Sequence, residues 1–386
     1  METFGASRPR VAVFAPSLEG GGAERAMLYL VSGLVDKGYP VDLVLVQAIG
    51  PYLSRLDPRV RIVDLGAARM VKALPKLVHY LRKRPPRVLI STLDHSNLIA
   101  LTARRMARVS VPVVVNVQNT VTPAADTLQP ELERFLPPLI RRFYPWAEAV
   151  TAVSQGVADD LVHVVGIPSD RVHVIFNPVV TSDLRRMAEA EVSHPFFAAG
   201  APPVLLGVGR LTRQKAFPDL IEAFEIVRQK KPCRLLILGE GEDRPKLERL
   251  IASRGLRADV SLPGYVDNPY AYMSRAHVFV LSSLWEGLPT VLIEAAACGT
   301  PVVATDCPSG PREILDHGRF GKLVPMNNPA ALADAVLDVL AGRYEGVPEA
   351  WLMRFTQEAA IDAYCGIIDA LAGAAPSTAA MRSVHG

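Results

Sequence analysis

The sequence predicts an α/β protein with two doubly wound parallel sheets, and three observations support this fold class. The chain has 386 residues, more than a single domain of roughly 100–200 residues would contain. Short runs rich in Val and Ile alternate with amphipathic stretches, as successive βαβ units require. The alternation stops over residues 181–203, which contain an Ala-Ala-Gly-Ala-Pro-Pro stretch typical of a linker, and then restarts. We therefore expect two such domains that face each other across a cleft.

The elements of the first half follow from its apolar runs. Parallel strands buried on both faces read as nearly continuous apolar runs, and the stretches between these runs have helical spacing. The expected strands are Val11–Pro16, Val41–Val46, Val88–Ser91, Val111–Val117, Ala149–Val153 and Val172–Phe176. The expected helices are Glu24–Asp36, Met70–Arg82, Asn97–Arg108 and Gly156–Val164.

The second half repeats the same alternation. Its expected strands are Val204–Val208, Arg234–Leu238, Val260–Leu262, Val278–Leu281, Pro301–Ala304 and Lys322–Val324. Its expected helices are Pro218–Gln229, Asp243–Ser253, Asn268–Arg275, Pro289–Ala297 and Pro329–Leu340, and Trp351–Leu371 predicts one long final helix. Ligands of such sheets bind at the carboxyl ends of the strands, so motifs that follow strands are the candidate functional residues.

Composition and charge exclude several classes of protein. Hydrophobic residues make up 49% and charged residues 21% of the chain, which excludes wholesale disorder. The sequence has neither an 18-residue apolar run nor an apolar leader, and its four cysteines lack C-x-x-C spacing, so we expect a cytoplasmic protein without a zinc site or disulfides. Residues 1–190 carry 23 Lys and Arg against 17 Asp and Glu. This basic half favours an anionic membrane surface or substrate over nucleic acid, which is not expected as a partner.

Absent motifs narrow the chemistry further. The chain has no G-x-x-x-x-G-K-[ST], G-x-S-x-G or H-E-x-x-H sequence, which argues against P-loop, serine-hydrolase and zinc-protease sites. Gly207-Val208-Gly209 lacks the third glycine of a nicotinamide-binding turn. The absence of D-x-D weakens any mechanism in which a metal bridges a diphosphate, and no cofactor or metal is expected.

A run of glycines follows the first expected strand. Gly20, Gly21 and Gly22 precede Ala23 and Glu24, where a helix is expected to begin. Residues without side chains allow a ligand to approach the backbone, and the first N–H groups of a helix attract an anion. A tight turn between strand and helix explains the same residues without a ligand, so both interpretations remain open.

Two cations follow the first expected strand of the second half. Gly209 and Arg210 begin this loop, and Lys215 ends it. An arginine can supply a forked pair of donors and a lysine a point charge, a combination that suits a diphosphate. Loops often carry exposed basic residues, so this pattern is weak by itself.

The most specific segment runs from Leu284 to Ala295. Glu286 is expected in a loop, Pro289 in the first turn of a helix, and Glu294 about one turn inside that helix. Carboxylates accept hydrogen bonds from the paired hydroxyls of sugars, and the start of the helix can receive a phosphate. The alternative interpretation makes Glu286 a helix cap and Glu294 a surface residue.

Five segments, in their order along the chain, resemble the retaining glycosyltransferases of family 4, which have the GT-B fold of two Rossmann-like domains. The resemblance covers about residues 11–370. The segments are Gly20–Glu24, Gly209-Arg210 with Lys215, Leu262–Val266, the pair Glu286 and Glu294, and Asp306–Glu313.

The resemblance implies roles for individual residues. Arg210 and Lys215 would bind the diphosphate of a nucleotide sugar, Glu294 the ribose hydroxyls, and Glu286 the hydroxyls of the transferred sugar. The backbone around the donor would come from Gly21, Gly22, Gly209, Val266, Gly287, Leu288, Pro289 and Thr290. The last helix would return to the first domain, giving an acceptor-side domain of residues 1–185 and 350–372, a donor-side domain of 200–345 and a flexible tail of 373–386.

One position departs from the family pattern. Many relatives carry a histidine after the fourth strand of the first domain, where this chain has Gln118. Glutamine exchanges hydrogen bonds but does not move a proton at neutral pH. His95 is the nearest ionisable alternative, although a lone histidine is more often structural. Retaining chemistry of this kind can use the leaving phosphate as the base, so the loss of the histidine need not abolish activity. The catalytic candidates are Glu286, Arg210, Lys215, His95 and Gln118.

The expected function is transfer of a hexose or N-acetylhexosamine from a nucleoside diphosphate sugar onto a glycan or lipid-linked acceptor, with retention. A UDP-linked donor is favoured over a GDP-linked one. The stripe Met70–Leu81, flanked by basic residues, could lie on an anionic membrane, although a helix facing its own sheet explains it as well. The alternatives are a GT-B-fold epimerase or phosphorylase, and a catalytically weak nucleotide-sugar-binding subunit.

Overall fold

The computed structural model describes residues 8–121 and 136–373. Within these ranges the strands form a seven-stranded and a six-stranded sheet, and neighbouring strands in both sheets are parallel. The described residues fall into two compact units: the first is drawn from Met1–Val153, Val157–Pro178 and Gln357–Gly386, and the second from Ser154–Gly156 and Val179–Thr356. The predicted fold class, two parallel α/β sheets, is confirmed.

The sheet of the first unit has the strand order β3-β2-β1-β4-β5-β6-β7. Its strands are β1 (Val11–Ala15), β2 (Val41–Leu45), β3 (Arg61–Asp64), β4 (Val88–Thr92), β5 (Val113–Val117), β6 (Ala149–Ala152) and β7 (Val172–Val174). Every residue of β1, β2, β4, β5 and β6 is buried, which explains why their sequences are almost continuously apolar. The sequence prediction missed β3, because this edge strand has only two apolar residues, between Arg61 and Asp64, and is mostly exposed.

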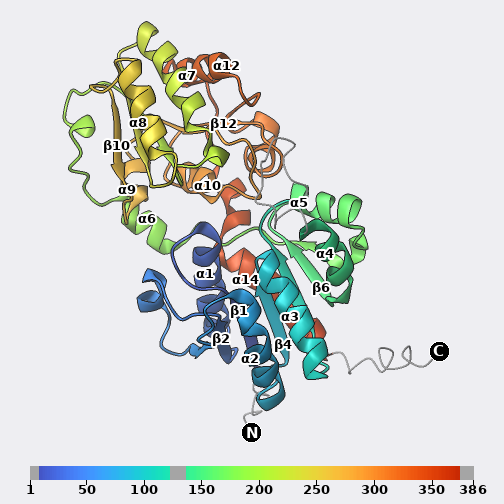
Figure 1. The fold of residues 1–386 in the computed structure, drawn as a ribbon. Helices are drawn as coiled ribbons and strands as arrows, with labels where there is room; N and C mark the ends of the chain where they lie inside the picture. Colours follow the sequence, from blue (N-terminus) through green and yellow to red (C-terminus); the bar gives the residue numbers. More distant parts are fainter. Residues whose placement is uncertain (1–7, 122–135, 374–386) are drawn as a thin grey trace. The chain divides into compact units, whose positions relative to one another are not determined.

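Helices cover the sheet of the first unit (Figure 1). They are α1 (Gly22–Asp36), α2 (Met70–Lys83), α3 (Asp94–Ala107), α4 (Leu136–Phe143), α5 (Gln155–Asp160), which begins in the second unit, and α14 (Gln357–Gly373). The C-terminal helix α14 packs beside α1. A Cβ on Gly33 of α1 would lie 2.4 Å from Cγ1 of Ile361, so this close approach requires glycine.

The sheet of the second unit has the order β10-β9-β8-β11-β12-β13. Its strands are β8 (Val204–Val208), β9 (Arg234–Leu238), β10 (Val260–Gly264), β11 (Val278–Leu281), β12 (Val302–Thr305) and β13 (Lys322–Val324). The main helices are α6 (Ser182–Ala188), α7 (Phe217–Lys230), α8 (Arg244–Ser253), α9 (Pro269–Met273), α10 (Thr290–Ala297), α11 (Pro311–Ile314), α12 (Pro329–Leu340) and α13 (Glu349–Leu352). Apolar residues of α7 and α12 pack with the strands into one buried core.

Three sequence expectations need correction. The helix predicted over Trp351–Leu371 is interrupted after α13: a 3-10 turn over Met353–Phe355 leads to extended backbone at Thr356, and α14 begins after it. The carbonyl of Phe355 accepts the N–H groups of Val179 and Val180, so the break lies where two chain segments are joined. The expected linker contains α6, whose first turn is capped by Thr181. The predicted tail starts with Gly373, the last residue of α14, and its other residues lie outside the described ranges.

The apolar stripe of α2 is largely internal. Leu77, Val78 and Leu81 are buried in the first unit, whereas Val71 is 72% exposed. The stripe is therefore explained mainly by packing of α2 within its own unit, and its basic neighbours remain exposed. None of the helices in the described ranges has the length and apolar content needed to cross a bilayer.

A buried hydrogen-bond network ties α14 to the first sheet. Asn116 of β5 donates through Nδ2 to the hydroxyls of Thr151 and Tyr364, each at 3.0 Å, and its Oδ1 accepts from Thr92 at 2.9 Å. These polar groups are removed from water, so each needs a partner within the protein. Tyr39 makes a second link to α14, since its hydroxyl donates to Asp369 at 2.6 Å.

We expect the substitution Tyr364→Phe to lower the free energy of unfolding by about 1–2 kcal/mol, because it leaves buried polar partners without one hydrogen bond. The matched substitution Tyr39→Phe removes the other hydroxyl that ties α14, but its partner Asp369 is half-exposed. We expect it to cost less than about 1 kcal/mol. Urea denaturation of both variants measures the two values, and equal losses would contradict the importance assigned to the Asn116 network.

A second polar cluster surrounds Asp42 of β2. Its carboxylate is 3% exposed and accepts hydrogen bonds from Arg10 at 2.9 Å, Arg61 at 2.9 Å and Tyr80 at 2.7 Å. Burial raises the pKa of Asp42, but the hydrogen bonds from Tyr80 and Arg61 and the charge of Arg61 lower it more, so the net shift is downward. The folded protein therefore holds Asp42 ionised more strongly than the unfolded chain does.

This shift predicts a dependence of stability on pH. A carboxyl group whose pKa is depressed by folding contributes stability above its unfolded pKa, about 3.9, and loses it as the pH falls through the folded value. We expect Asp42→Asn to be much less stable than the parent protein at pH 7, with the difference shrinking as the pH falls below about 4. Denaturation curves from pH 7 to pH 3 measure this, and a difference independent of pH would contradict it.

Candidate active site

The strand order of the second sheet reverses between β8 and β11, and the predicted residues follow these two strands. Lys215 lies after β8 and Glu286 after β11, and the two form an ion pair with 2.5 Å between Nζ and Oε1. The side chains are 15% and 7% exposed. Ser283 also donates to Oε1 of Glu286, at 2.6 Å. The carboxyl ends of strands at such a reversal are where ligands of open α/β sheets bind.

The loop after β8 is fixed to the loop after β11 by several hydrogen bonds. Gln214 donates through Nε2 to the carbonyl of Trp285 at 2.9 Å and accepts from the N–H of Leu284 at 2.9 Å. The hydroxyl of Ser282 donates to the carbonyl of Lys215 at 2.7 Å. These bonds fix the two loops to each other and position the backbone of Lys215, so its ammonium group lies beside Glu286.

Gly209 makes room for the lysine side chain. A Cβ at Gly209 would lie 3.1 Å from Cε of Lys215 and 3.3 Å from its Cγ and Cδ. This glycine therefore serves the approach of the Lys215 stem, a role that the sequence did not reveal. Arg210, next to it, is exposed and forms no ion pair with any residue in the described ranges.

Glu294 lies inside α10 and is 1% exposed. The helix begins at Thr290 with Pro289 as its N-cap, one residue later than the sequence suggested, and Gly287, Leu288 and Pro289 are buried in the loop before it. The alternative of Glu294 as a surface residue is therefore wrong. Glu286 makes no side-chain cap of α10 either, since α10 has none, and it accepts hydrogen bonds from Lys215 and Ser283 instead.

The loop after β12 packs against the segment before α10. The hydroxyl of Ser309 donates to the carbonyl of Gly287 at 2.8 Å. Gly310 has φ +91°, and a Cβ there would lie 2.4 Å from Cδ of Pro289, so the position requires glycine. Val266, in the loop after the edge strand β10, is partly exposed.

Sequence reasoning missed several residues of this site. Ser283 and Gln214 hold Glu286 and the lysine loop, but a serine and a glutamine in loops carry no distinctive signal. Cys307 is buried nearby: burial raises its pKa well above the usual range, and the negative charge of Glu286 adds to the shift. The Cys307 thiol therefore stays protonated at neutral pH.

The first sheet reverses its strand order between β1 and β4. Gly21 and Gly22 follow β1, are exposed, and form the N-cap and first residue of α1. The carboxylate of Glu24 lies close to Gly21, because its Oε2 would be 2.2 Å from a Cβ at that position, so this end of the fifteen-residue helix already has a negative charge beside it. His95 follows β4 as the second residue of α3 and is exposed, because this helix begins three residues before the expected start at Asn97.

Gln118 is held by its neighbours at the end of β5. Its Nε2 donates to Oδ1 of Asn116 and, at 3.3 Å, to Oδ1 of Asn177, while its Oε1 accepts from Nδ2 of Asn177 at 2.8 Å. Gln118 and Asn177 also line a small cavity of about 20 Å³ together with Ala23 of α1. Gln118 thus belongs to the same polar network as Tyr364, and its amide orientation is fixed by three hydrogen bonds.

A partly buried acid lies beside His95. Asp94 begins α3 and accepts a hydrogen bond from the hydroxyl of Tyr144 at 2.6 Å, and Tyr144 in turn accepts one from Asn97 at 3.0 Å. Burial raises the pKa of Asp94. The hydrogen bond between Tyr144 and Asp94 links the start of α3 to the segment after α4. This structural role explains Asp94 without a ligand. Among the described residues, no group of three or more His, Cys, Asp and Glu has a metal-binding arrangement.

Comparison with protein families matches both halves of the chain. Residues 20–183 match the family model described as Glycosyltransferase Family 4, and residues 202–342 match the model described as Glycosyl transferases group 1. The second match includes Gly209, Lys215, Glu286 and Glu294, and the first includes Gly21 and Gln118.

Individual relatives agree with the family models. An N-acetylgalactosamine-N,N'-diacetylbacillosaminyl-diphospho-undecaprenol 4-alpha-N-acetylgalactosaminyltransferase of Campylobacter jejuni is 30% identical over 343 residues, which cover 86% of this chain and 90% of the relative. The lipopolysaccharide core biosynthesis glycosyltransferase LpsE of Rhizobium meliloti is 26% identical, with coverage of 90% and 96%.

A solved structure has the same fold. The crystal structure of Anabaena Alr3699/HepE in complex with UDP and glucose superposes with a TM-score of 0.75 at 18% identity, covering 94% of this chain and 100% of that one. Together with the two sheets described above, these similarities show that the chain is a glycosyltransferase with the GT-B fold and belongs to glycosyltransferase family 4, the group 1 glycosyl transferases.

Proposed function

We propose that this glycosyltransferase moves a hexose or an N-acetylhexosamine from a UDP-linked donor onto a lipid-linked or glycan acceptor, with retention of the anomeric configuration. The observation that carries the proposal is the Lys215–Glu286 pair beside the strand-order reversal, with Glu294 buried in the adjoining helix. One cation and two carboxylates, on two loops and the helix that follows one of them, suit a diphosphate and two sets of sugar hydroxyls.

The named substrates of similar proteins support the finer parts of this proposal. The HepE structure contains UDP and glucose, which favours a UDP-linked donor over a GDP-linked one. The Campylobacter jejuni relative is named for transfer of N-acetylgalactosamine to a diphospho-undecaprenol-linked sugar, and LpsE for lipopolysaccharide core biosynthesis. We therefore infer an acceptor used in surface polysaccharide synthesis, reached at an anionic membrane surface.

In the proposed mechanism, Arg210 and Lys215 bind the donor diphosphate and Glu294 accepts hydrogen bonds from the ribose. Once the diphosphate is bound, Lys215 has a second anionic partner, and the Glu286 carboxylate can accept hydrogen bonds from the transferred sugar. The positive charges also stabilise the negative charge that develops on the leaving diphosphate. In this proposal the backbone groups of Gly287–Thr290 lie beside the donor, and Val266 borders the base.

The transfer needs one proton to move. The bond from the sugar C1 to the diphosphate oxygen breaks, the acceptor oxygen bonds to C1, and the acceptor proton passes to the leaving phosphate oxygen. Gln118 does not take this proton; it holds polar groups near the sugar through its bonds to Asn116 and Asn177. This assigns the first unit, with the returning helix, to the acceptor and the second unit to the donor.

One observation favours a second candidate, a nucleotide-sugar-binding subunit with weak catalysis. Gln118 occupies the position at which many relatives carry histidine, and its amide is engaged by neighbours. Such a subunit would bind a donor without consuming it when acceptor is present. An epimerase would convert the donor without acceptor, and a phosphorylase would require inorganic phosphate, so product analysis separates all of these from the proposed transferase.

We expect a UDP-linked sugar to raise the melting temperature of the protein more than the matching GDP-linked sugar. A ligand that binds only the native state stabilises it by about 2.7 kcal/mol when its concentration is 100 times Kd. A thermal-shift series of UDP-GlcNAc, UDP-GalNAc, UDP-glucose and GDP-mannose measures this preference. A larger shift with GDP-mannose would overturn the assignment of the donor.

The substitution Glu294→Gln should weaken binding of the preferred donor by about tenfold to a hundredfold. It keeps the shape of the side chain but removes the charge that strengthens hydrogen bonds from the ribose, an effect of about 1.5–3 kcal/mol. Glu248→Gln is the matched control, since Glu248 is 55% exposed on α8. Calorimetry compares the two variants, and a Glu294→Gln protein with the parental Kd would contradict the ribose role.

A further inference from the structure

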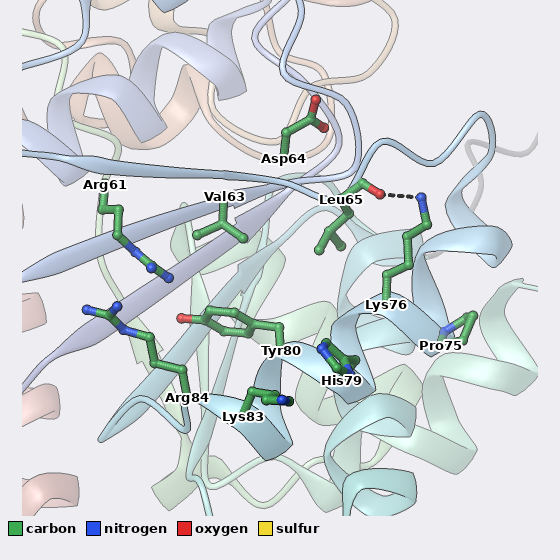
Figure 2. A pocket seen from close by; sticks show the side chains of 10 residues that line it. All are labelled: Arg61, Val63, Asp64, Leu65, Pro75, Lys76, His79, Tyr80, Lys83 and Arg84. Carbon is green, nitrogen blue, oxygen red and sulfur yellow. Dashed lines mark hydrogen bonds between the residues drawn. The ribbon is translucent and has the colours of Figure 1, made fainter.

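An open pocket of about 670 Å³ lies in the first unit between the edge strand β3 and helix α2. Figure 2 shows its lining side chains, which come from β3, the residue after it, and one face of α2 with Arg84. None of the proposed donor or catalytic residues borders this pocket. Its chemistry is therefore separate from the proposed active site.

One end of the pocket has more positive than negative charge. Arg61 and Arg84 line it there, near the hydroxyl end of Tyr80 (Figure 2). Behind them, the buried Asp42 lies 2.9 Å from Arg10, 2.9 Å from Arg61 and 3.8 Å from Nε of Arg84. Three guanidinium groups against one carboxylate leave two positive charges that this cluster does not neutralise.

These charges are accessible to a ligand. The side chains of Arg61 and Arg84 are 43% and 50% exposed. Lys83, the last residue of α2, also lines the pocket, is exposed, and forms no ion pair with any residue that the structure describes. Arg84 touches Asp42 only at 3.8 Å, so most of its donors are not used by that carboxylate.

The other end of the pocket is electrically more balanced. The ammonium group of Lys76 donates to the carbonyls of Leu65 and Gly66, at 2.5 and 2.8 Å. Asp64 accepts the N–H groups of Ala48 and Gly66 through Oδ1. Most of the unused hydrogen-bond donors are therefore at the end of the pocket that Arg61 and Arg84 line. The apolar wall of the pocket consists of Val63, Leu65, Pro75 and the ring of Tyr80.

We propose that this pocket binds a phosphate monoester. Arg84 supplies forked donors to the phosphate oxygens. Arg61 binds Asp42 through Nε and Nη2 and offers the phosphate its remaining N–H groups, and Lys83 adds a point charge. A monoester carries close to two negative charges at pH 7, which matches the two excess positive charges better than a single carboxylate does. The apolar wall receives the carbon atoms next to the phosphate, which belong either to a lipid or to a small soluble ester.

Two probes distinguish these sources of phosphate. Glycerol 3-phosphate, tested by calorimetry at fixed ionic strength, represents a soluble ester. Vesicles of phosphatidylcholine with and without phosphatidic acid, tested by flotation, represent a lipid. Both use the full chain and require no glycosyltransferase activity, so the result does not depend on the proposed function. Binding of glycerol 3-phosphate supports the soluble source, and binding only to phosphatidic acid vesicles supports the lipid source.

The double variant Lys83→Gln/Arg84→Gln should weaken binding of whichever probe binds by about tenfold or more, since it removes two charged contacts. The matched control is Arg69→Gln/Lys72→Gln, which makes the same charge change at exposed residues at the start of α2 that do not line the pocket. We expect less than about a twofold effect from the control.

The single variant Lys83→Gln is the control for misfolding, because Lys83 is exposed at the end of its helix. We expect this variant to have a lower affinity for the probe and the parental melting temperature. Equal losses in the two double variants would mean attraction to a basic surface rather than to the pocket, and would overturn the proposal. Failure of the parent protein to bind either probe would overturn it as well.

Discussion

The arrangement of the proposed donor site depends on one constraint, the reversal of strand order between β8 and β11. Crossover connections on opposite sides of this point leave the two loops adjacent at the carboxyl edge of the sheet. Lys215 and Glu286 are 71 residues apart in the sequence but form a largely buried ion pair. Hydrogen bonds of Gln214 and Ser282 then fix the two loops to each other.

Burial of the Lys215–Glu286 ion pair costs free energy of desolvation, and the residues around the pair offset part of this cost. Two charges taken out of water need good geometry and additional partners to be stable together. Ser283 supplies a second hydrogen bond to Glu286, and Gly209 allows the lysine stem to lie close to the backbone. A diphosphate arriving at Lys215 would meet an ammonium group already oriented, so less freedom is lost on binding.

Much of the fold followed from the sequence because buried parallel strands have a simple apolar pattern. All six strands of the second sheet were anticipated within a few residues, whereas the exposed edge strand β3 was not. The family resemblance implied ligand roles for Lys215 and Glu286 but not their ion pair. It did not reveal the supports of that pair either, because Ser283 and Gln214 are ordinary polar residues whose roles depend on their partners in the fold. The break at Met353–Thr356 was also missed, because the helical pattern continues through it while Phe355 binds Val179 and Val180.

The return of α14 has a consequence for how the protein is made. Synthesis proceeds from the N-terminus, so the strands of the first sheet leave the ribosome long before residues 357–373 do. In the complete fold, Ile361 of α14 packs on Gly33, and Tyr364 accepts a hydrogen bond from Asn116. Until α14 has been made, the surfaces at Gly33 and Asn116 remain uncovered. The first unit therefore reaches its complete core only after the second unit has been translated, and a chain that stops early carries an open apolar surface that invites aggregation.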